Sequence, residues 1–222
     1  LSAKLRDNQI ASNKAIPKRK NVSFAALFPT QKQIWLLSQS DKNTRYNVPI
    51  GLHLKGKVSS TRLSDAITKL IARHEVLRTS IQVKRGIPVQ LIHPVSDIKF
   101  TLDVIDLVDS KNGYLLAIDD MHERANYIIN FENRHLFVVR CYHLSDTSHL
   151  LFFNFHHTIF DDWSLKVFYD DLSMLYNNKQ QELPPLPIQY GDFTEAQYVN
   201  DKNKKAGIKF WKNILANIDY TL

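Results

Sequence analysis

The sequence predicts a mixed α/β domain, in which a mixed sheet is flanked by helices. Residues 48–54 alternate apolar and other side chains with a period of two, which indicates a strand. Residues 149–155, HLLFFNF, are apolar nearly throughout, which is typical of a central strand buried on both faces. Residues 60–75 carry apolar side chains three and four positions apart, the stripe of an amphipathic helix. Because such segments are interspersed along the chain, we expect α/β order with α+β character at its edges.

Shorter patterns predict the other elements in chain order. A helix is expected over residues 30–39, with the Thr30 hydroxyl capping its first amides. The other expected strands are 76–83 and 87–92, which flank the hairpin turn Arg85-Gly86, then 99–107, and 136–144, which precedes 149–155. The other expected helices are 114–127, 163–177, 190–199 and 206–217. The buried strand 149–155 therefore delivers its carboxyl end to a short loop before a helix.

The chain's charge is concentrated at one end. Of the net charge of +7, five units fall in residues 1–22, where six basic side chains face one acidic one: Lys4, Arg6, Lys14, Lys18, Arg19 and Lys20 against Asp7. We expect residues 1–22 to be a basic linker or the end of a preceding domain, and residues 23–222 to form one lobe. The remainder carries no basic stripe with interleaved aromatics, so no nucleic-acid partner is expected.

Composition sets the class of protein and its expected location. Of 222 residues, 44% are hydrophobic and 23% charged, which fits a globular domain and excludes disordered, collagen-like and transmembrane classes. Apolar runs are too short to span a bilayer, so no membrane partner is expected. The opening residues have no apolar signal region, and the single cysteine, Cys141, excludes an internal disulfide. We therefore expect a cytoplasmic protein.

Candidate chemistry lies in HHTIFDDWS, residues 156–164, directly after the buried strand. Histidine titrates near neutrality and can take a proton from an attacking amine or hydroxyl. Because adjacent side chains on an extended segment point to opposite faces, one of His156 and His157 can be structural while the other faces a cleft. Asp161 or Asp162 can hold a ring or cap the following helix. Catalysis and a structural role remain open on spacing alone, and zinc is disfavoured because no further close ligand completes a tetrahedron.

This segment resembles the His-His-x-x-x-Asp-Gly signature of condensation domains from nonribosomal peptide synthetases, which is shared with the wider chloramphenicol acetyltransferase-like superfamily. Three further segments are similar to family motifs and follow in family order: FPTQKQIWLL (28–37), ARHEVLRTSI (72–81) and LPPLPIQYGDF (183–193). The departures are Asp162 in place of the motif glycine, Gln33 in place of a common arginine, and Ala196 near the place of an aromatic residue.

The resemblance implies a fold and a reaction. A full condensation domain has two similar lobes and about twice this length, so the chain would be a single chloramphenicol acetyltransferase-like lobe, the amino-terminal one, without the carboxy-terminal lobe. Such domains are acyltransferases that join an acyl or peptidyl thioester to an aminoacyl thioester. Both substrates are carried on the phosphopantetheine arms of donor and acceptor carrier proteins, among neighbouring synthetase domains. No cofactor would be bound directly, and the isolated lobe would be inactive.

The resemblance also implies residue roles. His157 would position the acceptor amine or remove its proton, and His156 would pack inside. Asp161 would be structural, through the salt bridge with an arginine that the family makes. A backbone amide near Asp162 and the Ser164 side chain would bind the oxyanion or position the substrate.

Other motif residues are expected to support the site. Arg73, Glu75 and Arg78 are expected to form ion pairs at a helix-to-strand junction, and Trp163 to be structural near the site. An epimerising domain is disfavoured by Leu165, where that class has tryptophan, and a cyclising domain by the two histidines. A non-catalytic lobe that docks carrier proteins, and another acyltransferase of the superfamily, remain as alternatives.

Overall fold

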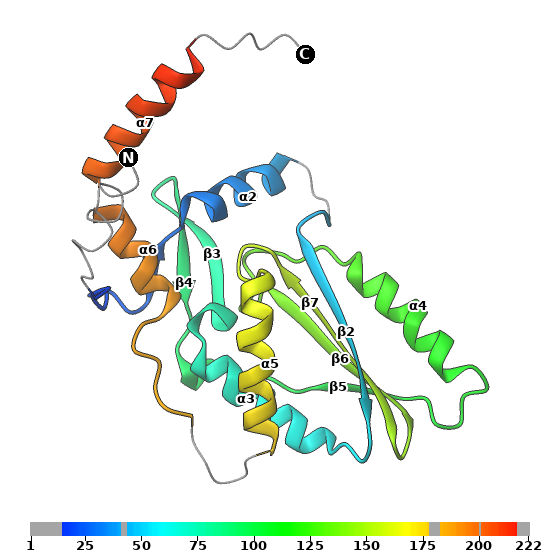
Figure 1. Ribbon diagram of the computed structural model, residues 1–222. Helices are drawn as coiled ribbons and strands as arrows, with labels where there is room; N and C mark the ends of the chain where they lie inside the picture. Colours follow the sequence, from blue (N-terminus) through cyan, green and yellow to red (C-terminus); the bar gives the residue numbers. More distant parts are fainter. Residues whose placement is uncertain (1–14, 41–43, 178–182, 200, 217–222) are drawn as a thin grey trace, which may run out of the picture.

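A computed structural model describes residues 15–40, 44–177, 183–199 and 201–216 (Figure 1). Its larger sheet has the strand order β2-β7-β6-β5. β7 pairs antiparallel with both neighbours, whereas β5 runs parallel to β6. The prediction of a mixed α/β fold is confirmed. The strands are β2 (Asn47–Lys55), β7 (Ser148–His156), β6 (Phe137–Ser145) and β5 (Asp103–Asp106).

Strand β7 is the centre of the fold, as its apolar sequence predicts. Every residue of β7 after Ser148 is buried, because helices cover both faces of the sheet. Helices α3 (Ser60–Arg73) and α5 (Asp162–Asn177) lie on one face, and α4 (Gly113–Ala125) lies on the other (Figure 1). The strand therefore ends at a fixed position, which is where His156 and the site begin.

A smaller sheet has the antiparallel order β1-β4-β3. Its β3–β4 hairpin turns through Arg85 and Gly86, which have φ values of 53° and 76°, the left-handed conformation that two-residue hairpins require. β1 was not expected from the sequence, because three residues carry too short a pattern to indicate a strand. The strands are β1 (Phe24–Ala26), β4 (Ile87–Ile92) and β3 (Thr79–Lys84).

Several local predictions differ from the structure, among them the start of β5 at Asp103 instead of residue 99 and the start of the last helix at Asp201 instead of residue 206. The segment after α3 first forms the 3₁₀ helix η1 (Glu75–Arg78), so β3 begins later than the strand expected from residue 76. Helix α2 begins at Pro29, whose fixed φ suits a first helical position, so Thr30 lies inside the first turn rather than at the cap. The amide of Phe28 instead donates to Gln31 Oε1 at 2.9 Å, as in a capping box.

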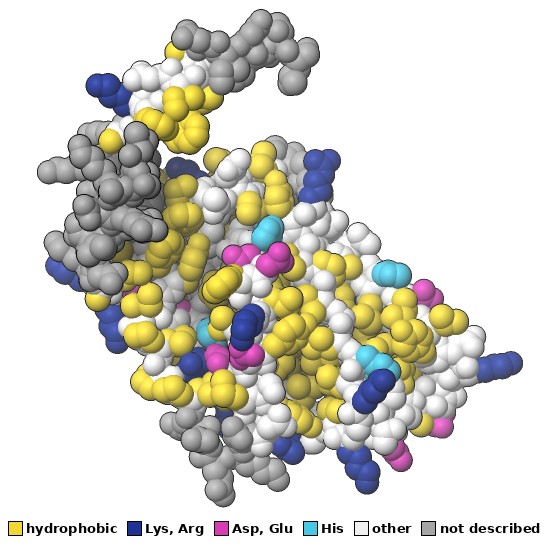
Figure 2. Space-filling model, in the orientation of Figure 1, with side chains coloured by type: hydrophobic (Ala, Val, Ile, Leu, Met, Phe, Trp, Pro, Cys, Tyr) yellow, Lys and Arg dark blue, Asp and Glu magenta, His cyan; other side chains and the backbone are white. Residues whose placement is uncertain are grey.

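The remaining elements of the described chain are helices. Helix α7 extends away from the sheets and carries exposed apolar side chains, among them Phe210 and Trp211 (Figures 1 and 2). In the described part of the chain, no helix is both long and apolar enough to cross a membrane. These elements are α2 (Pro29–Ser40), η2 (Val95–Asp97), α6 (Tyr190–Val199) and α7 (Asp201–Leu215).

Candidate active site

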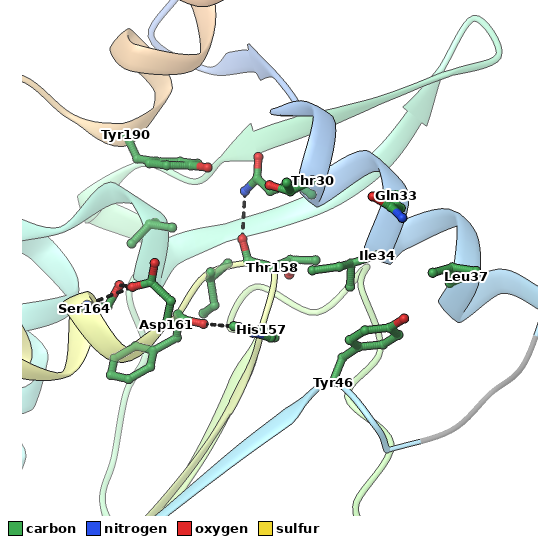
Figure 3. Close-up of a pocket in the computed structure, with 14 residues that line it drawn as sticks. Thr30, Gln33, Ile34, Leu37, Tyr46, His157, Thr158, Asp161, Ser164 and Tyr190 are labelled. Atoms are coloured by element: carbon green, nitrogen blue, oxygen red, sulfur yellow. Dashed lines mark hydrogen bonds between the residues drawn. The ribbon is translucent and has the colours of Figure 1, made fainter. Parts of the chain in front are cut away.

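A pocket of about 540 Å³ opens beside the loop that follows β7. Its walls come from the first turns of α2, from η1, from residues 157–161 and from the start of α6 (Figure 3). Histidine and acidic side chains gather on the molecular surface above the N-terminal end of α5 (Figure 2). The pocket therefore lies where the sequence predicts a site, at the carboxyl end of the buried strand.

His157 is exposed and lines this pocket, and two hydrogen bonds fix its position. Its backbone N–H donates to the Tyr46 carbonyl at 2.7 Å. Its ring Nδ1 lies 2.7 Å from the Phe160 carbonyl oxygen (Figure 3). Because a carbonyl oxygen can only accept, Nδ1 must carry the proton, and neutral His157 keeps a free lone pair on Nε2. This is the tautomer that a general base needs.

His156 has the opposite surroundings. It is 5% exposed, and its ring meets Phe131 edge-on with 4.6 Å between centroids. Its Nδ1 accepts the backbone N–H of Thr158 at 3.2 Å and lies 2.9 Å from the Thr158 hydroxyl. Burial, together with the charge of neighbouring His157, lowers the pKa of His156 to about 4. His156 is therefore neutral at pH 7 and acts as a packed, hydrogen-bonded residue.

Phe160 anchors the loop that carries His157. Its ring stacks on Phe155 of β7, with 4.0 Å between centroids and 7° between planes, and meets Phe168 of α5 edge-on at 5.8 Å. Such aromatic pairs contribute roughly 0.5–1.5 kcal/mol beyond their buried area. Because the carbonyl of the same residue holds the His157 ring, the core aligns the histidine.

Asp161 caps helix α5. Its Oδ1 accepts the backbone N–H of Ser164 at 2.8 Å and the Ser164 hydroxyl at 2.6 Å. Burial alone would raise the pKa of Asp161, but these hydrogen bonds and the charge of His157 hold it below its usual value. Among the described residues, no ion pair joins Asp161 to an arginine, and its carboxylate caps α5.

Asp162 and Trp163 begin α5, and neither lines the main pocket. Asp162 is exposed. Trp163 is 84% exposed and borders a separate cavity of about 160 Å³ that His74 and Val167 also line. The sequence predicted both residues near the site. In the structure both are exposed to solvent outside the lining of the main pocket.

Two residues of the pocket, Gln31 and Tyr190, were not identified as functional candidates from the sequence motifs. Gln31 is buried, and its Nε2 donates to the Thr158 carbonyl at 2.8 Å, which braces the loop from the α2 side. Tyr190 projects over the pocket from the start of α6 (Figure 3). Burial and the nearby charge of Asp161 raise the pKa of Tyr190 to about 12, so its hydroxyl remains a donor at neutral pH. Both residues match family motifs, but a motif match does not show which way a side chain points.

The motif ARHEVLRTSI forms ion pairs at the junction of α3 and η1. Arg73 Nε and His74 Nε2 each lie 2.7 Å from Asp171 Oδ2 on α5. Glu75 lies 2.7 Å from Arg19 and 3.7 Å from Arg78. Burial outweighs the pull of Asp171 and lowers the pKa of His74. This network fixes η1, which forms one wall of the pocket, against α5.

The described residues bring together no group of three or more His, Cys, Asp or Glu side chains that could hold a metal ion. His156 and His157 illustrate why: one is buried against Phe131, and the other lines the open pocket.

The family model described as "Condensation domain" matches residues 21–221. The chain belongs to the condensation-domain family. The chain is 34% identical over 176 residues to tyrocidine synthase 3 of Brevibacillus parabrevis, covering 78% of this chain and 3% of that protein. It is 29% identical over 191 residues to cyclosporin synthetase simA of Tolypocladium inflatum, covering 85% of the chain and 1% of that protein. The lobe therefore corresponds to a small part of each of these relatives.

Solved structures share the fold of the condensation lobe. The first condensation domain of the CDA synthetase superposes with a TM-score of 0.74 at 18% identity, over 90% of this chain and 52% of that one. The X-domain in complex with OxyB from teicoplanin biosynthesis gives 0.79 at 24% identity, over 94% and 47%. The lobe thus spans about half of each of these structures.

Proposed function

We propose that this chain is the His157-bearing lobe of a condensation domain that forms amide bonds between carrier-bound thioesters. The observation that carries the proposal is the hydrogen bond from His157 Nδ1 to the Phe160 carbonyl, which in the neutral ring places the lone pair of Nε2 at a pocket. Membership of the condensation-domain family supports the reaction class. The second half, which the matched structures contain, would close the pocket into a complete site.

The proposed reaction is a proton-coupled acyl transfer. The acceptor amine nitrogen attacks the donor thioester carbonyl, and His157 Nε2 takes the proton that the nitrogen loses. The tetrahedral intermediate then collapses to the amide and expels the donor thiolate, which recovers that proton from the imidazolium. Part of the rate comes from holding two tethered reactants together.

The neighbours of His157 have supporting roles in this proposal. His156 holds the end of β7, and Asp161 fixes the start of α5. The N–H and hydroxyl of Ser164 both donate to Asp161, so this side chain holds the cap rather than donating into the pocket. The backbone amide near Asp162 remains the predicted oxyanion donor.

Partners follow from the reaction class. We propose donor and acceptor carrier proteins, whose phosphopantetheine arms bring the thioesters to the pocket, and neighbouring synthetase domains. The curated relatives, which include bacitracin synthase 3 of Bacillus licheniformis, support this context. The lobe itself would bind no cofactor, and a cytoplasmic location remains a prediction.

The test compares wild type, His157→Ala and a control, His122→Ala, in the complete two-lobed domain with loaded carrier proteins. His122 is an exposed residue on α4, on the other side of the sheet. We expect His157→Ala to lower the condensation rate between about 100-fold and 10,000-fold, and the control to match wild type, with product detected by intact mass. Undiminished product from folded His157→Ala would remove the base from the mechanism.

A second candidate is a lobe that binds partner proteins without turnover. Asp162 replaces the family glycine beside the site, and the X-domain with the same fold was solved in complex with OxyB. Absence of product from wild type with every loaded pair, together with retained carrier-protein binding, would favour this candidate.

A further inference from the structure

Arg19 lies in the segment that the sequence assigns to a linker, yet its side chain is only 4% exposed. Its Nη2 lies 2.7 Å from Glu75 Oε2, and its Nη1 lies 2.9 Å from Asp192 Oδ1. Its backbone N–H also donates to Asp192 Oδ1 at 3.1 Å. One guanidinium therefore joins two carboxylates that belong to η1 and α6. We call these three residues the Arg19 clasp. Figure 1 shows the segment, in dark blue, running beside α6.

The Arg19 guanidinium packs closely against the backbone of α6 at Gly191. A Cβ added to Gly191 would lie 3.0 Å from Arg19 Nη1 and 3.2 Å from the Ala25 Cβ. Glycine at this position therefore allows the close approach of the Arg19 side chain to α6. Among the described residues, Arg19 Nε is buried and has no hydrogen-bond partner, so the clasp includes an unsatisfied donor.

The clasp connects to the pocket through Gln189. Asp192 Oδ2 accepts the backbone N–H of Gln189 at 2.9 Å. The Gln189 side chain donates to the Arg73 carbonyl at 2.9 Å and accepts the Glu75 N–H at 3.1 Å. These hydrogen bonds join the start of α6 to the start of η1, the same two elements that the clasp joins.

Two pocket-lining residues are direct chain neighbours of this network. Tyr190 lies between Gln189 and Asp192 in the sequence, and Val76 follows Glu75. Both belong to the pocket walls that do not carry His157. Arg19 thus contacts the two segments, at η1 and at the start of α6, whose backbones carry these walls.

We propose that Arg19 is a positioning residue that couples residues 15–22 to the Tyr190 wall of the pocket. A buried ion pair is often a weak stabiliser, because desolvation offsets much of the attraction between the charges. The fork geometry of arginine nevertheless fixes two carboxylates at once, which a lysine ammonium does not reproduce. A movement of residues 15–22 would thus displace the Tyr190 wall of the pocket through the contacts of Arg19. The catalytic consequence rests on the proposed function, whereas the coupling itself does not.

The first test measures the coupling without activity. The chain is prepared with ¹³C-labelled tyrosine rings, and the Tyr190 signal is assigned by its loss in Tyr190→Phe. Arg19→Lys keeps the positive charge and Arg19→Gln removes it, while Lys20→Gln is the matched control at an exposed neighbour. We expect the Tyr190 signal to shift in folded Arg19→Lys and to stay at its wild-type position in Lys20→Gln. An unchanged signal in Arg19→Lys would overturn the proposal, even if its melting temperature falls, because Arg19 would then be structural only.

The second test uses condensation in the complete two-lobed domain. We expect kcat to fall at least about tenfold in Arg19→Lys, since small misplacements at a reacting centre cost up to about 100-fold, and to stay unchanged in Lys20→Gln. An Arg19→Lys enzyme with wild-type kcat would overturn the catalytic consequence of the coupling, and the tyrosine signal decides the coupling itself. If wild type itself forms no product, the proposed function fails, and the tyrosine signal still decides whether Arg19 positions the wall.

Discussion

His156 and His157 are chemically identical neighbours with opposite environments. His156 is packed under Phe131 and hydrogen-bonded to Thr158, whereas His157 lies at an open pocket with one ring nitrogen free. The alternation of an extended chain separates them, and the surroundings on each side then assign the role. A histidine's function here is decided by the hydrogen bond to its Nδ1: an N–H donor makes that nitrogen an acceptor, and a carbonyl makes it a donor.

The largest effect expected from this difference is a pH dependence of stability that arises from His156. Its pKa of about 4 lies below the ordinary 6.5, so the unfolded chain binds the proton more tightly. The contribution of neutral His156 to the free energy of unfolding is therefore fully present above pH 6.5. It is lost as the pH falls from 6.5 towards 4. At 1.36 kcal/mol per unit, the loss is about 3 kcal/mol. Urea unfolding of wild type and His156→Gln at several pH values measures it.

The non-titrating variant isolates this contribution, because His74, His93 and His149 also have lowered pKa values and titrate in both proteins. We expect the stability advantage of wild type over His156→Gln to shrink between pH 7 and pH 4. A constant difference across that range would mean that His156 does not resist protonation when folded.

A smaller effect is expected at Gln31, which braces the buried side of the same loop. Gln31→Leu removes the donor to the Thr158 carbonyl and the acceptor for the Phe28 amide. Only the bond to the Thr158 carbonyl is fully buried, whereas the Phe28 amide is part-buried. Leaving one buried group unpaired costs about 1–3 kcal/mol, so we expect a loss of about 2 kcal/mol in the free energy of unfolding.

The control for Gln31 is Gln39→Leu, at an exposed position in the last turn of the same helix. It should stay within about 0.5 kcal/mol of wild type. Calorimetric melting measures both variants. Equal melting temperatures for the two would show that the brace on Thr158 contributes nothing to stability.

The comparison of the two histidines also shows where sequence reasoning works. The buried strand, the short loop after it and the divergence of His156 and His157 could be predicted, because period and composition act over a few residues. The Arg19 clasp could not, since its ion pairs join residues 56 and 173 positions apart. A basic run at the start of a chain indicates a linker, and nothing local distinguishes Arg19 from exposed Lys18 and Lys20. The cap made by Asp161 was one of two roles that its sequence position allowed.

The smallest expected changes in stability are those of variants at Asp161 and Asp162. These variants distinguish a helix-capping role of Asp161 from a role in an ion pair. Asp161→Ala removes the acceptor for two Ser164 hydrogen bonds and should cost about 1 kcal/mol. Asp161→Asn keeps an acceptor oxygen and should restore most of that loss. Asp162→Ala is the matched control, at an exposed neighbour outside the pocket lining, and should change stability by less than about 0.5 kcal/mol.

Urea unfolding of the four proteins at pH 7 separates the two roles, because the asparagine variant removes the charge while keeping the hydrogen bonds. If Asp161→Asn is as unstable as Asp161→Ala, the charge carries the stabilisation, and an arginine partner must be sought in the complete domain. If Asp161→Asn matches wild type, the cap is the whole structural role of Asp161. The loop of His157 is then held by hydrogen bonds and aromatic stacking within this lobe alone.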